Sequence, residues 1–106
     1  MKKEERNIVF DKYSGHCAYC GKEITIDVMQ VDHIEPLHNG GEDSIENKNP
    51  SCKSCNHYKR GYGLEGFRKY MMKLHERIIK DYISRVANDY GIINITPFSG
   101  KFYFEN

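Results

Sequence analysis

The sequence has no apolar run that approaches the roughly 20 residues needed to cross a bilayer, so no membrane-spanning helix is expected. Its first residues, MKKEER, lack the apolar stretch of a secretory signal peptide. It also has no internal repeat and no low-complexity linker, and a length of 106 residues suits a single domain. These absences predict one globular domain in an intracellular, cytoplasmic location.

The sequence also has almost no excess of charge of either sign. It contains 16 lysines and arginines against 15 aspartates and glutamates, which gives a formal net charge of +1. This balance gives no support to nucleic-acid binding, which would have to depend on local basic patches.

Cysteine is scarce but regularly spaced. Cys17 and Cys20 form one Cys-x-x-Cys pair, and Cys52 and Cys55 form another. Because disulfides are disfavoured in a reducing compartment, such pairs indicate a metal site. Four thiolates can hold one Zn²⁺ ion in a closed tetrahedral site that stabilises the fold. A single pair would leave a redox dithiol or free thiols open, but two pairs without any other cysteine favour structural zinc.

Local patterns predict short helices and short strands in the first 61 residues. Residues 1–13 suit a helix, and residues 28–34 suit a strand that Pro36 stops. In the loop that follows, Asn-Gly-Gly supplies positive φ angles without steric cost. Pro50 limits any second strand, and a short helix is expected from the second cysteine pair to Gly61.

The C-terminal part changes to a helical pattern. Apolar residues recur at steps of three and four, which predicts an amphipathic helix whose apolar side belongs to the core. One long helix that ends at Gly91, or two helices with a bend near His75, would fit. The alternating segments INIT and KFYFE predict a terminal hairpin or an edge strand. The apolar positions of the helical pattern are Leu64, Phe67, Met71, Leu74, Ile78, Tyr82 and Val86.

Polar residues between and beside the cysteine pairs could support hydrolysis. Histidine titrates near neutrality and can accept a proton from water, and carboxylate and amide oxygens bind hard cations such as Mg²⁺. His33, Asp32 and the two asparagines Asn47 and Asn56 are therefore sufficient for metal-assisted phosphodiester hydrolysis. On composition alone they also fit a half-buried strand histidine and ordinary turn asparagines.

The order and spacing of these segments resemble the zinc-knuckle subclass of the HNH endonucleases. The resemblance covers about residues 13–60 and includes CAYC, VDHIEPL, NGGEDSIEN and CKSCNHYK. It implies an α+β protein with a ββα-metal (HNH) fold, a structural zinc and a C-terminal helical extension. Residues 1–106 would form a single HNH nuclease domain, with a helical and hairpin extension over about 61–106 that is similar to extensions of phage-type members.

The resemblance also implies a role for each polar residue. His33 would be the general base that activates water, and Asn47 would orient it through hydrogen bonds. Asp32 and Asn56 would be the protein ligands of a catalytic Mg²⁺ or Mn²⁺ ion. The last position of the family's motif, which Asn56 matches here, is often histidine. His57 is therefore the alternative ligand if the helix register differs by one residue. One residue rotates a helical side chain by about 100°, which favours Asn56.

The strand poses a geometric problem for these roles. Adjacent side chains on a regular strand point to opposite faces. Asp32 and His33 can therefore serve one phosphate only where the strand ends and bends, and Pro36 lies close enough to permit this.

The expected function is that of a metal-dependent DNA endonuclease that nicks one strand per site and leaves a 5′-phosphate and a 3′-hydroxyl. The expected partner is DNA and not a membrane, with the protein a monomer or weak homodimer and phage or restriction components as further partners. Competing interpretations are a non-catalytic zinc-stabilised module that binds DNA or protein, and a two-zinc domain of the RING type, which needs eight ligands. Basic residues that would position the DNA backbone are His38, Lys53, Lys59 and Arg60.

Overall fold

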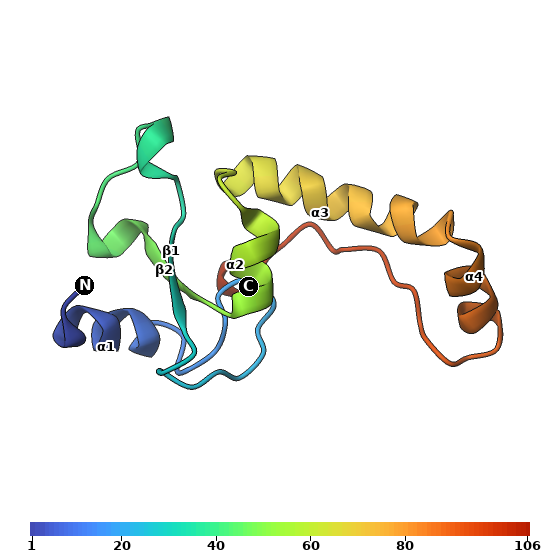
Figure 1. Ribbon diagram of the computed structural model, residues 1–106, viewed down its shortest axis with the longest axis horizontal. Coiled ribbons are helices and arrows are strands. Elements are labelled where there is room, and N and C mark those ends of the chain that lie inside the picture. The colour runs from blue at the N-terminus through green and yellow to red at the C-terminus, as the bar shows by residue number, and fades with distance from the viewer. The chain divides into compact units, whose positions relative to one another are not determined.

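The computed structural model describes all residues from 1 to 106. They form two compact units (Figure 1). The first unit comprises Met1–Leu64 and Phe102–Asn106, and the second comprises Glu65–Lys101. The helices are all too short or too polar to cross a membrane.

The first unit combines a two-stranded sheet with short helices, which confirms the α+β class. Strand β1 (Gln30–His33) pairs antiparallel with β2 (Lys48–Ser51). Helix α1 (Lys3–Asp11) precedes this sheet in the chain and α2 (Lys53–Lys59) follows it (Figure 1). Three single-turn 3₁₀ helices complete the unit: η1 (Leu37–Asn39), η2 (Ile45–Asn47) and η3 (Tyr103–Glu105).

Both strands are short for identifiable reasons. β1 starts later than the predicted range 28–34, because the N–H groups of Val28 and Met29 both bond to the carbonyl of Thr25 and close a turn. β2 contains Pro50, which has no N–H for the ladder and therefore limits the pairing, as expected. The sheet is thus a small platform rather than a large core.

Basic side chains attach α1 to the rest of the first unit. Arg6 Nη2 donates to the carbonyls of Ile26 (2.7 Å) and Met29 (3.1 Å) in the turn before β1. Lys12 Nζ donates to the carbonyl of Lys48 at the start of β2. These hydrogen bonds therefore connect α1 to the turn before β1 and to the first residue of β2.

The C-terminal residues belong to the first unit but form no strand, so the prediction of a hairpin or edge strand is wrong. The Phe102 N–H donates to the Glu105 carboxylate (2.8 Å), which closes a 3₁₀ turn instead of a ladder. The Phe104 N–H donates to the carbonyl of Ala18 (2.8 Å). Phe102 is only 2% exposed, so burial of this ring decides the local structure.

The second unit contains most of the predicted amphipathic helix, now divided in two. Helix α3 (Leu64–Ile79) starts at the last residue of the first unit, and α4 (Tyr82–Asp89) follows it. Of the two arrangements that fit the sequence, the structure has two helices. The break lies at Lys80 and Asp81, a few residues after the expected position at His75.

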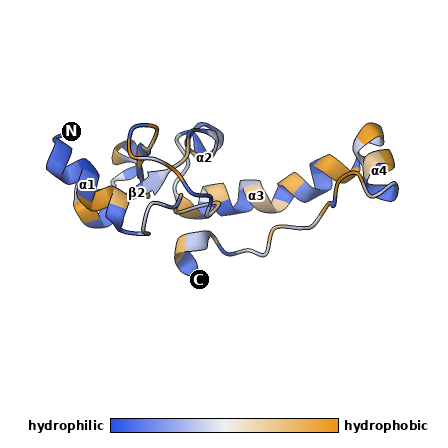
Figure 2. Ribbon diagram, turned by 90° about the horizontal axis from the view of Figure 1, so that it is seen from below, coloured by the Kyte–Doolittle hydropathy of each residue, from blue (hydrophilic) through white to orange (hydrophobic).

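Burial along the two helices departs from the sequence prediction. Figure 2 shows apolar and polar residues alternating along α3, and apolar residues on α4. Phe67 on α3 is buried, but Tyr82 is 73% exposed and Val86 is 37% exposed. The helical period was therefore predicted correctly, whereas the assignment of Tyr82 and Val86 to the core was wrong.

Candidate active site and metal centre

The four cysteines converge in the first unit. Their Sγ atoms all lie within 4.8 Å of one another, with 3.9 Å between those of Cys20 and Cys52. Thiolates that bind one tetrahedral Zn²⁺ ion at about 2.3 Å lie about 3.8 Å apart. The cluster formed by Cys17, Cys20, Cys52 and Cys55 is thus positioned to bind one metal ion, and its all-sulfur composition suits zinc.

Electrostatics within the cluster favour a bound cation. A hydrogen bond from Cys55 lowers the pKa of Cys17 to about 4, and the same contact raises the pKa of Cys55. Burial raises the pKa of Cys20. Since the thiolate is the ligating form, a metal ion would replace the protons that these sulfurs share.

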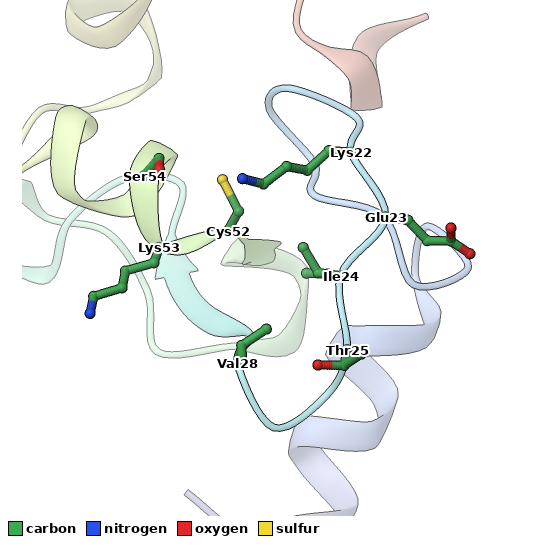
Figure 3. Close-up of a pocket in the computed structure, with 8 residues that line it drawn as sticks. All are labelled: Lys22, Glu23, Ile24, Thr25, Val28, Cys52, Lys53 and Ser54. Atoms are coloured by element: carbon green, nitrogen blue, oxygen red, sulfur yellow. The ribbon is translucent and has the colours of Figure 1, made fainter.

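The second cysteine pair also begins α2. Cys52 is the N-cap residue, and its Sγ accepts a hydrogen bond from the Cys55 N–H (3.3 Å). A pocket of about 490 Å³ lies beside Cys52, where Lys22 extends toward the sulfur while Lys53 points away (Figure 3). Lys22 can therefore offset part of the negative charge that four thiolates leave on a divalent ion.

Asp32 is held by two donors in the interior of the first unit. Its side chain is 7% exposed, its Oδ2 accepts a hydrogen bond from the Tyr19 hydroxyl, and Lys59 Nζ lies 3.2 Å from Oδ1 and 3.1 Å from Oδ2. Burial raises the pKa of Asp32, while the Tyr19 hydrogen bond and the Lys59 charge act against this rise. Burial also raises the pKa of Tyr19, so its hydroxyl keeps its proton and donates.

Lys59 differs from the surface lysine that the sequence suggested. It is 0% exposed, and its Nζ also donates to the carbonyl of His33 (3.0 Å). A buried ammonium requires a charged or hydrogen-bonding partner, and Asp32 is that partner. Lys59 therefore joins the end of α2 to β1 and directs its charge toward Asp32 rather than toward solvent.

Helix periodicity separates Asn56 from His57. Residues three apart on a helix are neighbours, whereas residues two apart are not. Asn56 therefore shares the side of α2 that carries Lys59, and His57 does not. Asn56 is half-buried and His57 is exposed, although both line a pocket of about 530 Å³ together with Lys53. Asn56 thus lies on the less exposed side of α2.

His33 contacts an acidic residue that the sequence interpretation missed. Its Nε2 lies 3.0 Å from Asp43 Oδ1, which also lies 3.1 Å from Lys48 Nζ. The hydrogen bonds from His33 and Lys48 lower the pKa of Asp43, so this carboxylate stays ionised. In the tautomer with the proton on Nε2, the lone pair for accepting a proton is on Nδ1. In the sequence, Asp43 is distinguished only as an acidic residue within a turn-rich loop.

The strand alternation expected for Asp32 and His33 is visible in their partners. The Asp32 side chain contacts Lys59 of α2, whereas the His33 side chain contacts Asp43 in the loop between the strands. The two side chains therefore meet different elements, as adjacent residues on a strand must. β1 ends at His33, one residue before the predicted end of the strand, and the two side chains share no partner there.

Asn47 holds the loop between the two strands closed. Its Nδ2 donates to the carbonyls of Glu35 (2.9 Å) and Glu42 (2.8 Å), and its Oδ1 accepts from the Glu35 N–H (3.0 Å). These bonds go to the loop backbone and not to the imidazole of His33. Asn47 therefore acts on the loop that presents Asp43.

Two glycines permit this loop to fold tightly. Gly40 has a φ of 87°, in the left-handed region where glycine has no steric penalty. A Cβ at Gly41 would lie 1.8 Å from the Glu35 carbonyl oxygen, so no other residue fits without movement of the backbone. Gly40 is thus needed for its positive φ angle, and Gly41 for the close approach of the chain to the Glu35 carbonyl.

The other predicted phosphate contacts lie on the surface at the ends of α2. His38, Lys53 and Arg60 are all exposed. A Cβ at Gly61 would lie 3.2 Å from the His38 ring, so His38 lies beside the C-terminal end of the helix, near Arg60. Lys53 is the first residue of the helix.

The interior around Asp32 is unusually polar for so small a unit. Asn49, its partner across the sheet, is fully buried, and its amide makes no hydrogen bond of good geometry, although its contact with Tyr19 acts against the rise in the pKa of that residue. Buried polar groups without partners cost stability. Proteins tolerate such violations mainly at functional sites, which singles out the region between β1, β2 and α2.

A comparison with protein families agrees with this geometry. Residues 17–60 match the family described as HNH endonuclease. The match spans both cysteine pairs and the polar residues between them, all within the first unit. Residues 17–60 are therefore similar to the HNH endonucleases, and the four cysteines, positioned for one metal ion, are consistent with the zinc-knuckle subclass. No curated protein matches the chain.

Proposed function

We propose that this protein is a metal-dependent DNA endonuclease that hydrolyses phosphodiester bonds, nicks one strand per site, and leaves a 5′-phosphate and a 3′-hydroxyl. The observation that carries the proposal is the pairing of His33 with the ionised carboxylate of Asp43, inside the HNH-matched segment and at the residue that follows Asp32 in the chain. A base with an orienting partner, next to a candidate metal ligand, is what hydrolysis of a phosphodiester requires.

In this proposal His33 is the general base. Its Nδ1 accepts a proton from the attacking water, while Nε2–H donates to Asp43. The negative charge of Asp43 stabilises the imidazolium that forms. Asn47 keeps the loop closed, and so holds Asp43 within 3.0 Å of the ring. Asn47 thereby orients His33 through the loop rather than by direct contact.

Asp32 and Asn56 supply the oxygen ligands for a catalytic Mg²⁺ or Mn²⁺ ion. Oxygen donors suit these hard cations, and the ion would have to displace the ammonium of Lys59 from Asp32. When bound, the ion polarises the scissile phosphate and stabilises the leaving 3′-oxygen. Zn²⁺ at the four cysteines has a structural role, because that site leaves no open coordination position.

The DNA backbone is contacted by exposed basic residues at the two ends of α2. His38 and Arg60 lie at one end and Lys53 at the other. Such side chains fix the position of the phosphates without reading the bases. Lys59, which the sequence grouped with them, acts through Asp32 instead.

One observation favours a second candidate, a non-catalytic zinc-stabilised module that binds DNA or protein. The Asp32 carboxylate is 7% exposed and already accepts hydrogen bonds from Tyr19 and Lys59. In that case the buried ion pair would be structural, and added Mg²⁺ would neither bind at Asp32 nor support cleavage.

A metal titration of three variants tests the assignment of the catalytic ligands. Asn56→Ala should weaken nicking with every metal, and Asn56→His should shift the preference toward Ni²⁺ or Zn²⁺, since imidazole suits those ions. His57→Ala is the matched control and should retain activity. An inactive His57→Ala protein beside an active Asn56→Ala protein would make His57 the ligand.

A further inference from the structure

We infer that four basic side chains of the second unit form a binding surface for the phosphate backbone of duplex DNA. The inference rests on the proposed function for the identity of the nucleic acid, but it uses none of the residues around His33, Asp32 or the cysteines. We call this surface the basic stripe. Its members are Lys69, Lys73 and Arg77 of α3 and Lys80, the residue that follows the helix.

The spacing of the basic stripe places its members on one side of α3. They lie four, four and three residues apart, and residues at such steps are neighbours on a helix. All four are exposed. The eight-residue step from Lys69 to Arg77 spans about 12 Å of helix axis, and each DNA strand carries one phosphate per about 3.4 Å. The basic stripe is therefore long enough to contact about three phosphates of one strand.

The opposite side of α3 is apolar and packs within the second unit. Phe67 is buried, and Met71, Leu74 and Ile78 are half-buried (Figure 2). The last three line a cavity of about 330 Å³ together with residues of the segment 93–98. Because this apolar side faces the remainder of the unit, the basic stripe on the other side faces solvent.

The lysines of the basic stripe are free to contact an anion. Lys69, Lys73 and Lys80 have no acidic partner and donate no side-chain hydrogen bond. Arg68 on the same helix differs, because it pairs with Glu65 (2.9 Å) and donates to the carbonyl of Gly100 (2.6 Å). Its charge is used inside the second unit, whereas the charge of the three lysines is not.

Arg77 is held in place while most of its donors stay available. Its guanidinium lies over the ring of Tyr70 (5.6 Å to the centroid), and Nη1 donates to the Tyr70 hydroxyl (3.3 Å). A guanidinium has five N–H donors in a fixed fork that matches the geometry of a phosphate. The contact with Tyr70 therefore orients Arg77 and leaves other donors for a phosphate oxygen.

An ordinary solvated helix face is the alternative to a binding surface. Basic residues near a helix C-terminus interact favourably with the helix dipole, which accounts for Arg77 and Lys80. It does not account for Lys69 and Lys73, which lie in the middle of α3, where like charges four residues apart destabilise a helix. Glu76 lies among them and leaves an excess of three positive charges (+4 − 1) on this side. The whole chain has a net charge of only +1, so its positive charge is concentrated here.

The experiment measures binding of a short fluorescent DNA duplex by anisotropy. It uses full-length, zinc-loaded protein without Mg²⁺ or Mn²⁺, at salt concentrations from about 50 to 200 mM. The test variant is Lys69→Gln/Lys73→Gln/Lys80→Gln. Each lost phosphate contact lowers the slope of log K against log salt by about 0.9, so the variant should lower it by about 2.7. Glutamine forms helices about as well as lysine does, and circular dichroism should show an unchanged fold.

The matched control is Lys2→Gln/Lys3→Gln/Lys101→Gln, which removes the same charge from exposed lysines outside the basic stripe. It should keep the wild-type slope. An unchanged slope in the test variant, or an equal fall in both variants, would overturn the inference. Poly-glutamate that displaces the protein as well as unlabelled DNA does would assign the basic stripe to acidic proteins, and would overturn the assignment to DNA.

Nicking by the same proteins separates the inference from the proposed function. If the wild type binds DNA through the basic stripe but does not nick with Mg²⁺ or Mn²⁺, the proposed function fails and the binding surface stands. If the wild type nicks and the test variant binds with the wild-type slope, the inference is wrong and the proposed function stands.

Discussion

Asn47→Ala removes the side chain that closes the loop between β1 and β2. The amide makes three hydrogen bonds to the backbone of Glu35 and Glu42, at 2.8 to 3.0 Å. Each such bond contributes about 0.5–1.5 kcal/mol net, and their partial exposure favours the lower half of that range. We therefore expect a loss of about 2 kcal/mol in the free energy of unfolding. That is a large fraction of the roughly 5–15 kcal/mol that a small domain has.

Urea unfolding of the zinc-loaded protein, followed by circular dichroism, measures this loss. Asn39→Ala is the control, because Asn39 is an exposed residue of the same loop and its backbone bond to Pro36 would remain. It should change stability by less than about 0.5 kcal/mol, as surface substitutions usually do. Nicking by Asn47→Ala should fall as well, since a loosened loop no longer holds Asp43 against His33. An Asn47→Ala protein as stable as Asn39→Ala would refute the role given to this amide.

Two further predictions concern the parts that hold the first unit together. Cys52→Ser removes a metal ligand and the sulfur that caps α2. Because structural zinc contributes roughly 10 kcal/mol or more in small domains, the variant should be insoluble or unfolded. A folded protein that elemental analysis shows to contain no metal would contradict this. Phe102→Ala should lower the free energy of unfolding by about 3–5 kcal/mol in thermal unfolding, as expected for a fully buried ring. Ile8→Ala, at a residue 52% exposed, is the control and should have a small effect. Equal effects would show that the C-terminal residues do not stabilise the first unit.

The sequence predicts the metal cluster well because each Cys-x-x-Cys pair is a local feature. Two residues between cysteines bring their sulfurs together in one turn, so only the meeting of the two pairs depends on the fold. The Gly-Gly loop and the short helix α2 are local in the same sense. Helix geometry alone favours Asn56 over His57 as the ligand, and this assignment stays a prediction.

The surroundings of Asp32 depend on residues far apart in sequence and could not be predicted. Lys59 is 27 residues away from Asp32, and its side chain would usually be solvated; only the position of α2 against β1 buries it. Asp43 reaches His33 because the loop closes around Asn47. The alternating KFYFE segment suggested a strand, but burial of Phe102 and its bond to Glu105 turned the chain into a 3₁₀ helix.

Nicking of supercoiled plasmid by zinc-loaded protein tests the central claim most directly. Wild-type protein should convert supercoiled to open-circular DNA with added Mg²⁺ or Mn²⁺ and should not do so with EDTA. His33→Ala should keep its zinc and its fold and lose about 100- to 10,000-fold in rate, the contribution of a general base. Nicking by a folded His33→Ala protein at the wild-type rate, or no nicking by the wild type with either ion, would contradict the account.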